Sequence, residues 1–445
     1  MSPNWPDVER EVTEHLQNLI RIETTNPPGN ELSAAQYLAE VLEHEGIPAQ
    51  VLEPEPGRGS VVARLKGDGS ERPLLLMSHL DVVPAEADKW RHPPFSGELV
   101  DGFVWGRGAV DTKNLTAVET VVMLLLKREG VRLKRDVILA ATADEEAGGR
   151  SGLGWIVEHR PELVDAEYGI NEGGGFGLDI GGRRAYFCQT SEKGICWLKL
   201  RAHGTPGHGS VPKGDNAVVA LSGALARLGR ARLPLHITPT VREFVRQLAV
   251  LLPFPQSFVL PLILNPALEP LVAKGLAKNR MLGSVLNAVI RNTVSPTMLN
   301  AGSKINVIPS GAEAGVDGRL IPGQMPDDLL REIGPCMGKN VNVEVMGTSQ
   351  PSEADYRTPF YEILRQTLTE EDPQAVLMPF MVPGMTDARF VAAQGVTVYG
   401  FCPMKQDTDE SPLEMAHGHN ERISVANLGF AVRLLYNAVT KLCAI

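Results

Sequence analysis

Several histidine and carboxylate side chains occur where apolar runs of the sequence end. His79 directly follows the run 73–78, and the three carboxylates of residues 144–146 follow the run 135–142. Apolar runs of this length are typical of buried strands, and α/β folds place their ligand sites at the carboxyl ends of such strands. We therefore expect these side chains to lie close together at one edge of a sheet.

The same types of side chain recur at three further places. Asp111 stands between a glycine-rich turn and a helical pattern, Glu172 follows a short apolar run, and the segment 415–421 (MAHGHNE) contains two histidines. Taken singly, an aspartate before a helix is most often the N-cap of that helix. A histidine two residues from a carboxylate is most often an ordinary loop residue beside a solvated acidic side chain. Together, two histidines and three carboxylates suit two borderline-hard divalent ions with one carboxylate bridging them.

Asp81 lies two residues after His79, where it can orient a metal-bound imidazole. A carboxylate that accepts the second N–H of such an imidazole fixes its tautomer and raises its basicity. Zinc suits this mixed nitrogen and oxygen donor set best, and cobalt or manganese would use the same ligands. We therefore expect two zinc ions.

Composition and charge argue against several other classes of protein. The formal net charge of −10 opposes nucleic-acid binding. Five cysteines without CxxC spacing favour neither a disulfide framework nor a thiolate zinc site, and they suggest a reducing, cytoplasmic compartment. The N-terminus lacks a signal-peptide pattern, and the most apolar stretch, 248–268, is interrupted by prolines, so we expect no membrane span.

The elements that must position these groups fall into two patterns. A chain of 445 residues is too long for one ordinary core. Residues 1–193 and 350–445 alternate helical and strand patterns, which predicts an α/β sandwich with a largely parallel sheet. Residues 194–349 have the order strand, helix, strand, strand, helix, strand, which predicts an inserted ferredoxin-like α+β domain. Its first helix is expected at 217–233, and the apolar stretch 234–291 after it is longer than this motif needs.

Five motifs resemble those of the aminoacylase/carboxypeptidase family of zinc peptidases, the M20 clan. The resemblance extends over essentially the whole chain and implies a zinc-peptidase catalytic domain with an inserted lid and dimerisation domain. In order along the chain, the motifs are SHLDVVP (78–84), WGRGAVDTKN (105–114), ATADEEAGG (141–149), NEGG (171–174) and AHGHNE (416–421).

This resemblance implies a set of metal ligands. His417 fits the family's His-x-x-Asn/Asp-Glu spacing, whereas His419 does not. The ligands implied are His79 and Glu172 on one ion, Glu146 and His417 on the other, and Asp111 bridging both. Asp81 would orient His79.

The resemblance also implies catalytic and substrate-binding residues. Glu145 is expected to be the general base, because a carboxylate beside a ligand can take a proton from a metal-bridging water; the alternative is a structural charge. His208 would stabilise the oxyanion in the partner subunit's site, which implies a homodimer, although a histidine on a Gly/Pro turn is otherwise unremarkable. The contacts implied for the substrate, some of which could instead cap strand ends, are Asn306, Arg319, Gly384 and Arg389.

The predicted function is hydrolysis of the amide bond of a small peptide or N-acyl amino acid by a metal-bridged hydroxide. The carboxypeptidase S and N-acyl-amino-acid hydrolase branch is the most similar part of the family. An inactive metal-binding scaffold would have lost some of the site residues, and none is missing. A metal phosphoesterase would need a basic cluster at the strand ends. The stretch 234–291 would pack within the inserted domain or at a dimer contact, or form a hydrophobic wall for acyl chains.

Overall fold

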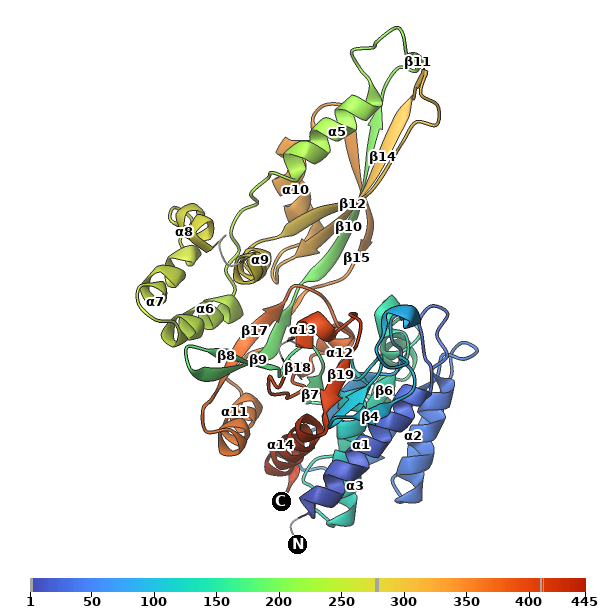
Figure 1. Ribbon diagram of the computed structural model, residues 1–445, viewed down its shortest axis with the longest axis vertical. Helices are drawn as coiled ribbons and strands as arrows, with labels where there is room; N and C mark the ends of the chain where they lie inside the picture. Colours follow the sequence, from blue (N-terminus) through green and yellow to red (C-terminus); the bar gives the residue numbers. More distant parts are fainter. Residues whose placement is uncertain (1–2, 277–279, 409, 411) are drawn as a thin grey trace. The chain divides into compact units, whose positions relative to one another are not determined.

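The described chain forms two compact units. The computed structural model describes residues 3–276, 280–408, 410 and 412–445 (Figure 1). Unit 1 consists of Met1–Thr190, Ala354–Phe380 and Thr386–Ile445, and unit 2 consists of Ser191–Glu353 and Met381–Met385. The domain transitions predicted from the sequence are at 193/194 and 349/350.

Most strands of unit 1 belong to a ten-stranded sheet of order β1-β2-β6-β3-β7-β18-β9-β16, in which β8 and β17 also pair with β9 and of which β16 and the last residues of β9 and β17 belong to unit 2. Strands β6, β3, β7 and β18 are parallel neighbours, whereas the pairs β1–β2, β2–β6, β18–β9, β8–β9 and β16–β9 are antiparallel. The strands are β1 Ala49–Leu52, β2 Ser60–Leu65, β3 Leu74–His79, β6 Val137–Thr142, β7 Tyr168–Asn171, β8 Gly177–Ile180, β9 Arg183–Glu192, β16 Ser352–Glu353, β17 Ala375–Val382 and β18 Thr397–Gly400.

The expected α/β fold is confirmed, but the sheet is mixed rather than largely parallel. One cause is a tight hairpin between β8 and β9, where Gly181 and Gly182 both have a positive φ. Such a pair favours the two-residue turn that joins antiparallel strands.

Both faces of the parallel strands are covered by helices, which explains their continuous apolar sequence. Along β3, Leu74 and Leu76 belong to one hydrophobic cluster, and Leu75 and Met77 belong to another. The first cluster contains residues of α1 Trp5–Arg21, α2 Leu32–His44, α3 Lys113–Arg128, α11 Pro359–Glu371 and α14 Val425–Cys443. The second contains residues of α4 Leu153–His159 and α12 Ala388–Ala392.

Unit 2 carries a four-stranded antiparallel sheet of order β12-β14-β10-β15. Helices α5 and α10 share one hydrophobic cluster with this sheet. The order of strands and helices along the chain is the expected ferredoxin-like order. Helix α5 ends at Leu228, earlier than expected, because Gly229 and the approach to Pro234 disfavour further helix. The elements are β10 Gly194–His203, α5 Ala217–Leu228, β12 Thr293–Ala301, β14 Gly311–Leu320, α10 Pro326–Met337 and β15 Val341–Thr348.

The apolar stretch after α5 forms a cluster of short helices beside this sheet (Figure 1). Prolines interrupt it, and no helix among the described residues is long and apolar enough to cross a membrane. Residues 277–279 of this stretch lie outside the described residues. The helices are α6 Pro239–Leu251, α7 Gln256–Val259, η4 Leu260–Leu264, α8 Glu269–Leu276 and α9 Arg280–Val289.

Smaller elements complete the two units. In unit 1, β19, β5 and β4 form a three-stranded sheet, and in unit 2, β11 pairs with β13. Their bounds, with those of the remaining short helices, are η1 Ala87–Lys89, β4 Glu98–Val100, β5 Phe103–Trp105, η2 Glu145–Ala147, η3 Pro161–Leu163, β11 Gly207–His208, β13 Val307–Ile308, α13 Pro412–Met415 and β19 Arg422–Ser424.

Candidate metal centre

The carboxyl ends of three adjacent parallel strands bring the predicted ligands together. His79 is the last residue of β3, Glu145 and Glu146 lie in the short helix η2 after β6, and Glu172 follows β7. Because β6, β3 and β7 are neighbours and parallel, these ends meet at one edge of the sheet. Asp111 lies two residues before the start of α3.

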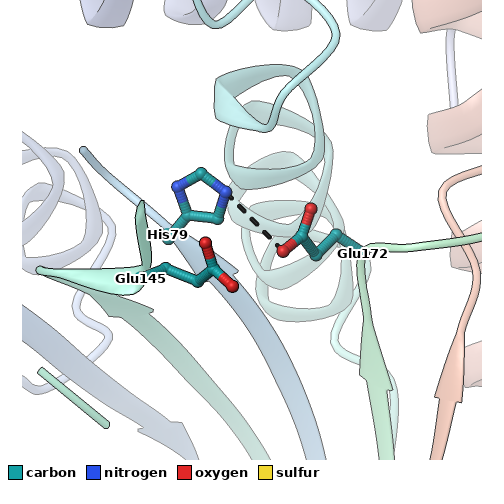
Figure 2. Close-up of side chains that lie close together, drawn as sticks. All are labelled: His79, Glu145 and Glu172. Carbon is teal, nitrogen blue, oxygen red and sulfur yellow. Dashed lines mark ion pairs between the residues drawn. The ribbon is translucent and has the colours of Figure 1, made fainter. Parts of the chain in front are cut away.

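Asp111 lies between the two predicted histidine ligands. Its Oδ1 is 3.3 Å from His79 Nε2, and its Oδ2 is 3.2 Å from His417 Nε2. Each imidazole nitrogen also faces a second carboxylate: His79 Nε2 is 3.7 Å from Glu172 Oε1, and His417 Nε2 is 3.2 Å from Glu146 Oε2 (Figure 2 for His79 and Glu172). Each histidine thus shares Asp111 and has one carboxylate of its own.

The donor atoms fit a divalent metal. Two groups, His79 with Glu145 and Glu172 and His79 with Asp111 and Glu146, have ligand atoms within 4.8 Å of one another. Glu146 Oε1 is buried and has no hydrogen-bond partner among the described residues. A buried carboxylate oxygen normally has a partner, so this atom is a free ligand position.

Burial and crowding shift the pKa values of these groups. Burial lowers the pKa of the His79 imidazole, but the Glu172 carboxylate and the hydrogen bonds to Asp111 and Asp81 outweigh it and raise that pKa well above its usual value. Hydrogen bonds to Asp111 and Glu146 raise the pKa of His417 to about 10. A metal ion must displace these protons, so the site should bind metal more tightly as pH rises.

Glu145 points toward His79 and Glu172 from the end of β6 (Figure 2). Burial, and then the charge of Glu172, raise the pKa of the Glu145 carboxyl well above its usual value. A carboxylate with a raised pKa is a stronger base than an ordinary glutamate and takes a proton from water more readily.

The Asp81 side chain holds the turn that carries two of these groups. Its carboxylate accepts the backbone N–H of Glu145 at 3.1 Å and of Glu146 at 3.0 Å, and the Asn26 amide donates to it at 2.8 Å. His79 Nδ1 lies 2.9 Å from the Asp81 backbone carbonyl and 3.5 Å from the carboxylate. Asp81 therefore contacts His79 mainly through its backbone, and its carboxylate fixes the η2 turn.

A buried polar network stands behind this turn. The Arg58 guanidinium donates to Asp144 at 2.7 Å and lies 3.1 Å from Glu31. Burial raises the pKa of Glu31 to about 7. Asp144 lies in the motif ATADEEAGG, whereas Arg58, Glu31 and Asn26 stand outside the five motifs and were not predicted.

Glu421, the last residue of the AHGHNE motif, holds the loop that presents Asp111. Its fully buried carboxylate accepts the backbone N–H groups of Gly108 at 3.1 Å, Val110 at 2.7 Å and Asp111 at 3.0 Å. Arg107 donates to its other oxygen at 2.7 Å. The segment that carries His417 therefore also fixes the backbone of Asp111, which the motif spacing alone did not reveal.

The residues of unit 2 that are expected to contact the oxyanion and the substrate do not all lie together. His208 is exposed in β11, with its Nδ1 2.7 Å from Ser210 Oγ, and Gly209 N–H donates to the Asn306 carbonyl at 2.8 Å. Arg319 lies near the far end of β14 and pairs with Asp317 at 2.9 Å. His208 and Asn306 are thus neighbours, and Arg319 is distant from both.

The 384–389 loop is hydrogen-bonded to the turn after the predicted ligand Glu146. The Arg389 guanidinium donates to the backbone carbonyls of Thr386 and Gly148, both at 2.6 Å. Burial raises the pKa of the neighbouring Asp387 to about 7. Gly384 lies in the short segment assigned to unit 2.

Known proteins match this arrangement along most of the chain. The family model for peptidase family M20/M25/M40 matches residues 75–441. The chain belongs to this family. The predicted family and enzyme class are therefore confirmed, and neither a phosphoesterase nor an inactive scaffold is supported.

Two relatives and one solved structure illustrate the match to M20 proteins. The human N-fatty-acyl-amino acid synthase/hydrolase PM20D1 is 33% identical over 389 residues, which cover 84% of this chain and 75% of that protein. Aminoacylase-1 of Sus scrofa is 27% identical and covers 92% and 90%, respectively. The M20 family metallo-carboxypeptidase Sso-CP2 from Sulfolobus solfataricus has a TM-score of 0.71 at 19% identity, with 97% of this chain and 98% of that chain covered.

Proposed function

We propose that this M20 protein is a two-zinc enzyme that hydrolyses the amide bond of N-acyl amino acids or small peptides with a free carboxylate. The observation that carries the proposal is the position of Asp111, whose two oxygens each face one imidazole. A carboxylate in that position suits a bridge between two ions. The similarity to an N-fatty-acyl-amino acid hydrolase and to an aminoacylase favours N-acyl amino acids as substrates.

The contacts support one division of the ligands between two ions. His79 and Glu172 would hold the first, Glu146 and His417 the second, and Asp111 both. Imidazole and carboxylate donors without a thiolate fit zinc, and they would also accept cobalt or manganese. When bound, such ions lower the pKa of a coordinated water toward about 7 and polarise the substrate carbonyl.

Glu145 is proposed to move the proton in both halves of the reaction. Its carboxylate takes a proton from the water whose oxygen attacks the amide carbon. It then gives that proton to the leaving nitrogen as the C–N bond breaks, so the products are a carboxylate and an amine. Asp81 keeps Glu145 in place through the backbone N–H that it accepts.

A homodimer with shared sites is proposed from the geometry of unit 2. Strand β12 is an edge strand whose side chains are mostly exposed, with Met298 72% and Leu299 62% exposed. An apolar edge strand readily pairs with another strand. Arg319 lies near the end of β14, and the strand from Gly311 to Arg319 spans about 27 Å at roughly 3.4 Å per residue. His208 lies in β11, at the other end of this sheet (Figure 1), so the two residues would serve different sites of a dimer.

The remaining binding residues and the compartment also stay proposals. Asn306, Arg319, Gly384 and Arg389 are proposed to contact the substrate, although two guanidinium donors of Arg389 already bond to backbone carbonyls. A cytoplasmic location is proposed because all five cysteines are free thiols.

The test is a hydrolysis panel with metal-replete enzyme. N-acyl amino acids from acetyl to dodecanoyl, dipeptides and a phosphoester would be compared at equal enzyme concentration. We expect cleavage of amides that carry a free carboxylate, with loss of activity on chelation and recovery with zinc. Cleavage of the phosphoester alone, or activity that survives complete chelation, would refute the proposal.

A further inference from the structure

The helical stretch after α5 exposes an uncharged apolar surface. Residues 247–268 contain no Asp, Glu, Lys or Arg. Six large apolar side chains between residues 250 and 271 are exposed, and we call them the apolar tip: Val250 70%, Phe254 84%, Phe258 71%, Val259 40%, Leu268 37% and Leu271 72%.

Internal packing of the helices accounts for other side chains but not for the apolar tip. Leu260 and Ile263 of η4 are almost fully buried, as are Phe244 and Leu248 of α6. Phe254 precedes α7 and Phe258 lies within it, and the N–H groups of Ser257, Phe258 and Val259 donate to carbonyls of residues 253 and 255. Both rings are exposed in this short segment, Phe254 at 84% and Phe258 at 71%.

The charge of this region differs from that of the rest of the chain. Residues 234–291 contain six basic and two acidic residues, a net charge of +4, whereas the whole chain carries −10. Exposed cations stand on both sides of the uncharged run, with Arg242 in α6 and Lys274 in α8. An apolar centre between cations fits an interface of acyl chains covered by phosphate groups.

The same charge argues against a second copy of the chain as the occupant. In a two-fold dimer the same patch meets itself, so the net positive regions would face each other. A lipid surface instead presents phosphate to the cations and hydrocarbon to the phenylalanines.

We propose that α6, α7, η4 and α8 dock this protein on the surface of a lipid bilayer. Phe254 and Phe258 enter the interface, and Arg242 and Lys274 face the lipid phosphates. The purpose of docking rests on the proposed function, because amphiphilic N-acyl amino acids concentrate in the same interface. The docking itself does not depend on catalysis.

Flotation with vesicles of phosphatidylcholine and phosphatidylglycerol, without substrate, tests the proposal. We expect the unchanged protein to float with the vesicles. A Phe254→Ser/Phe258→Ser variant should bind the vesicles at least roughly tenfold more weakly. Leu99→Ser, which removes a half-exposed leucine of β4 in unit 1, is the matched control and should float normally. Lys274→Gln should weaken binding at low salt.

Two outcomes would overturn the proposal. One is that the unchanged protein does not float at any lipid concentration. The other is that the double variant floats normally. If its only change is then a smaller oligomer in sedimentation, the apolar tip would be assigned to contacts between copies of the chain. Hydrolysis of a water-soluble N-acetyl amino acid, measured on the same samples, should be equal in all variants. A failure of the proposed function would appear there and not in the flotation.

Discussion

Glu145 is the side chain on which the proposed chemistry depends most. Its raised pKa suits a group that must accept and return one proton, and its carboxylate lies close to the proposed ligands His79 and Glu172. The sequence predicted this role because Glu145 lies in one of the family motifs, directly after an apolar strand.

Replacement of Glu145 by glutamine should abolish proton transfer and leave the centre intact. We expect Glu145→Gln to lower turnover by at least about a thousandfold, with unchanged metal content and thermal stability. Glu158→Gln, which alters an exposed glutamate of α4, should have normal turnover. Near-normal turnover of Glu145→Gln in metal-replete samples would remove the general base from the account.

Glu421 allows a test of a residue that touches neither metal nor substrate. The Glu421 carboxylate accepts three backbone N–H groups beside Asp111 on one oxygen and the Arg107 guanidinium on the other. A glutamine at this position would therefore direct its own N–H₂ group at one of these hydrogen-bond donors. We expect Glu421→Gln to weaken metal affinity by about ten- to a hundredfold, as measured by competition with a chelator.

Excess zinc should restore much of the Glu421→Gln activity, because a positioning residue acts only through the ligand that it holds. The exposed Glu86→Gln, which alters the partner of His419, should leave metal affinity unchanged. Normal metal affinity in Glu421→Gln would reduce this network to a structural contact.

At the scale of residues, the sequence located the candidate ligands but not what holds them. His79, Asp111, Glu146, Glu172 and His417 stand in motifs whose chemistry is legible from residue type. The Asp81 contacts to the η2 turn depend on backbone N–H groups, which every residue has, so no side-chain pattern could reveal them.

At the scale of elements, the apolar runs 73–78 and 135–142 predicted the central strands β3 and β6 well. The runs at β3 and β6 are apolar throughout because both faces are buried, and such runs are easily recognised. Strand β17 was missed and β9 was not predicted as a continuous strand, since neither strand carried a motif. The turn that makes β8 and β9 antiparallel depended on two glycines.

The exposed edge strand β12 gives a prediction at this scale. Leu299→Lys should place a charge on the proposed contact between copies, so we expect it to produce monomers that keep their metal. If the sites are shared, the monomers should also lose most of their activity. Sedimentation and a hydrolysis assay on the same samples measure both effects.

The matched control for β12 is Leu99→Lys on β4, which alters a leucine of similar exposure in unit 1. It should leave the dimer and the activity intact. A fully active monomeric Leu299→Lys variant would place every catalytic residue within one subunit.

At the scale of the whole molecule, the metal centre couples stability to pH. In the metal-free protein, the pKa of His417 is raised to about 10 by Asp111 and Glu146, so this stabilisation is complete below the unfolded value near 6.5 and is lost as pH rises. Burial raises the pKa values of Glu145 and Glu172, and their ionisation on raising the pH opposes folding as well.

We therefore expect the metal-free protein to lose thermal stability between pH about 6 and about 9, and added zinc to remove most of this loss. Thermal unfolding with and without zinc across this range is the measurement. A metal-free protein whose melting temperature rises over the same interval would contradict the electrostatic description of the site.

The central claim is that two metal ions lie on either side of Asp111. Anomalous diffraction at the zinc edge from crystals grown with zinc tests it most directly. We expect two peaks per chain, each about 2.0 to 2.2 Å from one Asp111 oxygen, one bound to His79 and Glu172 and the other to His417 and Glu146. A single peak, or two peaks of which one is bound by His419 instead of His417, would contradict the account.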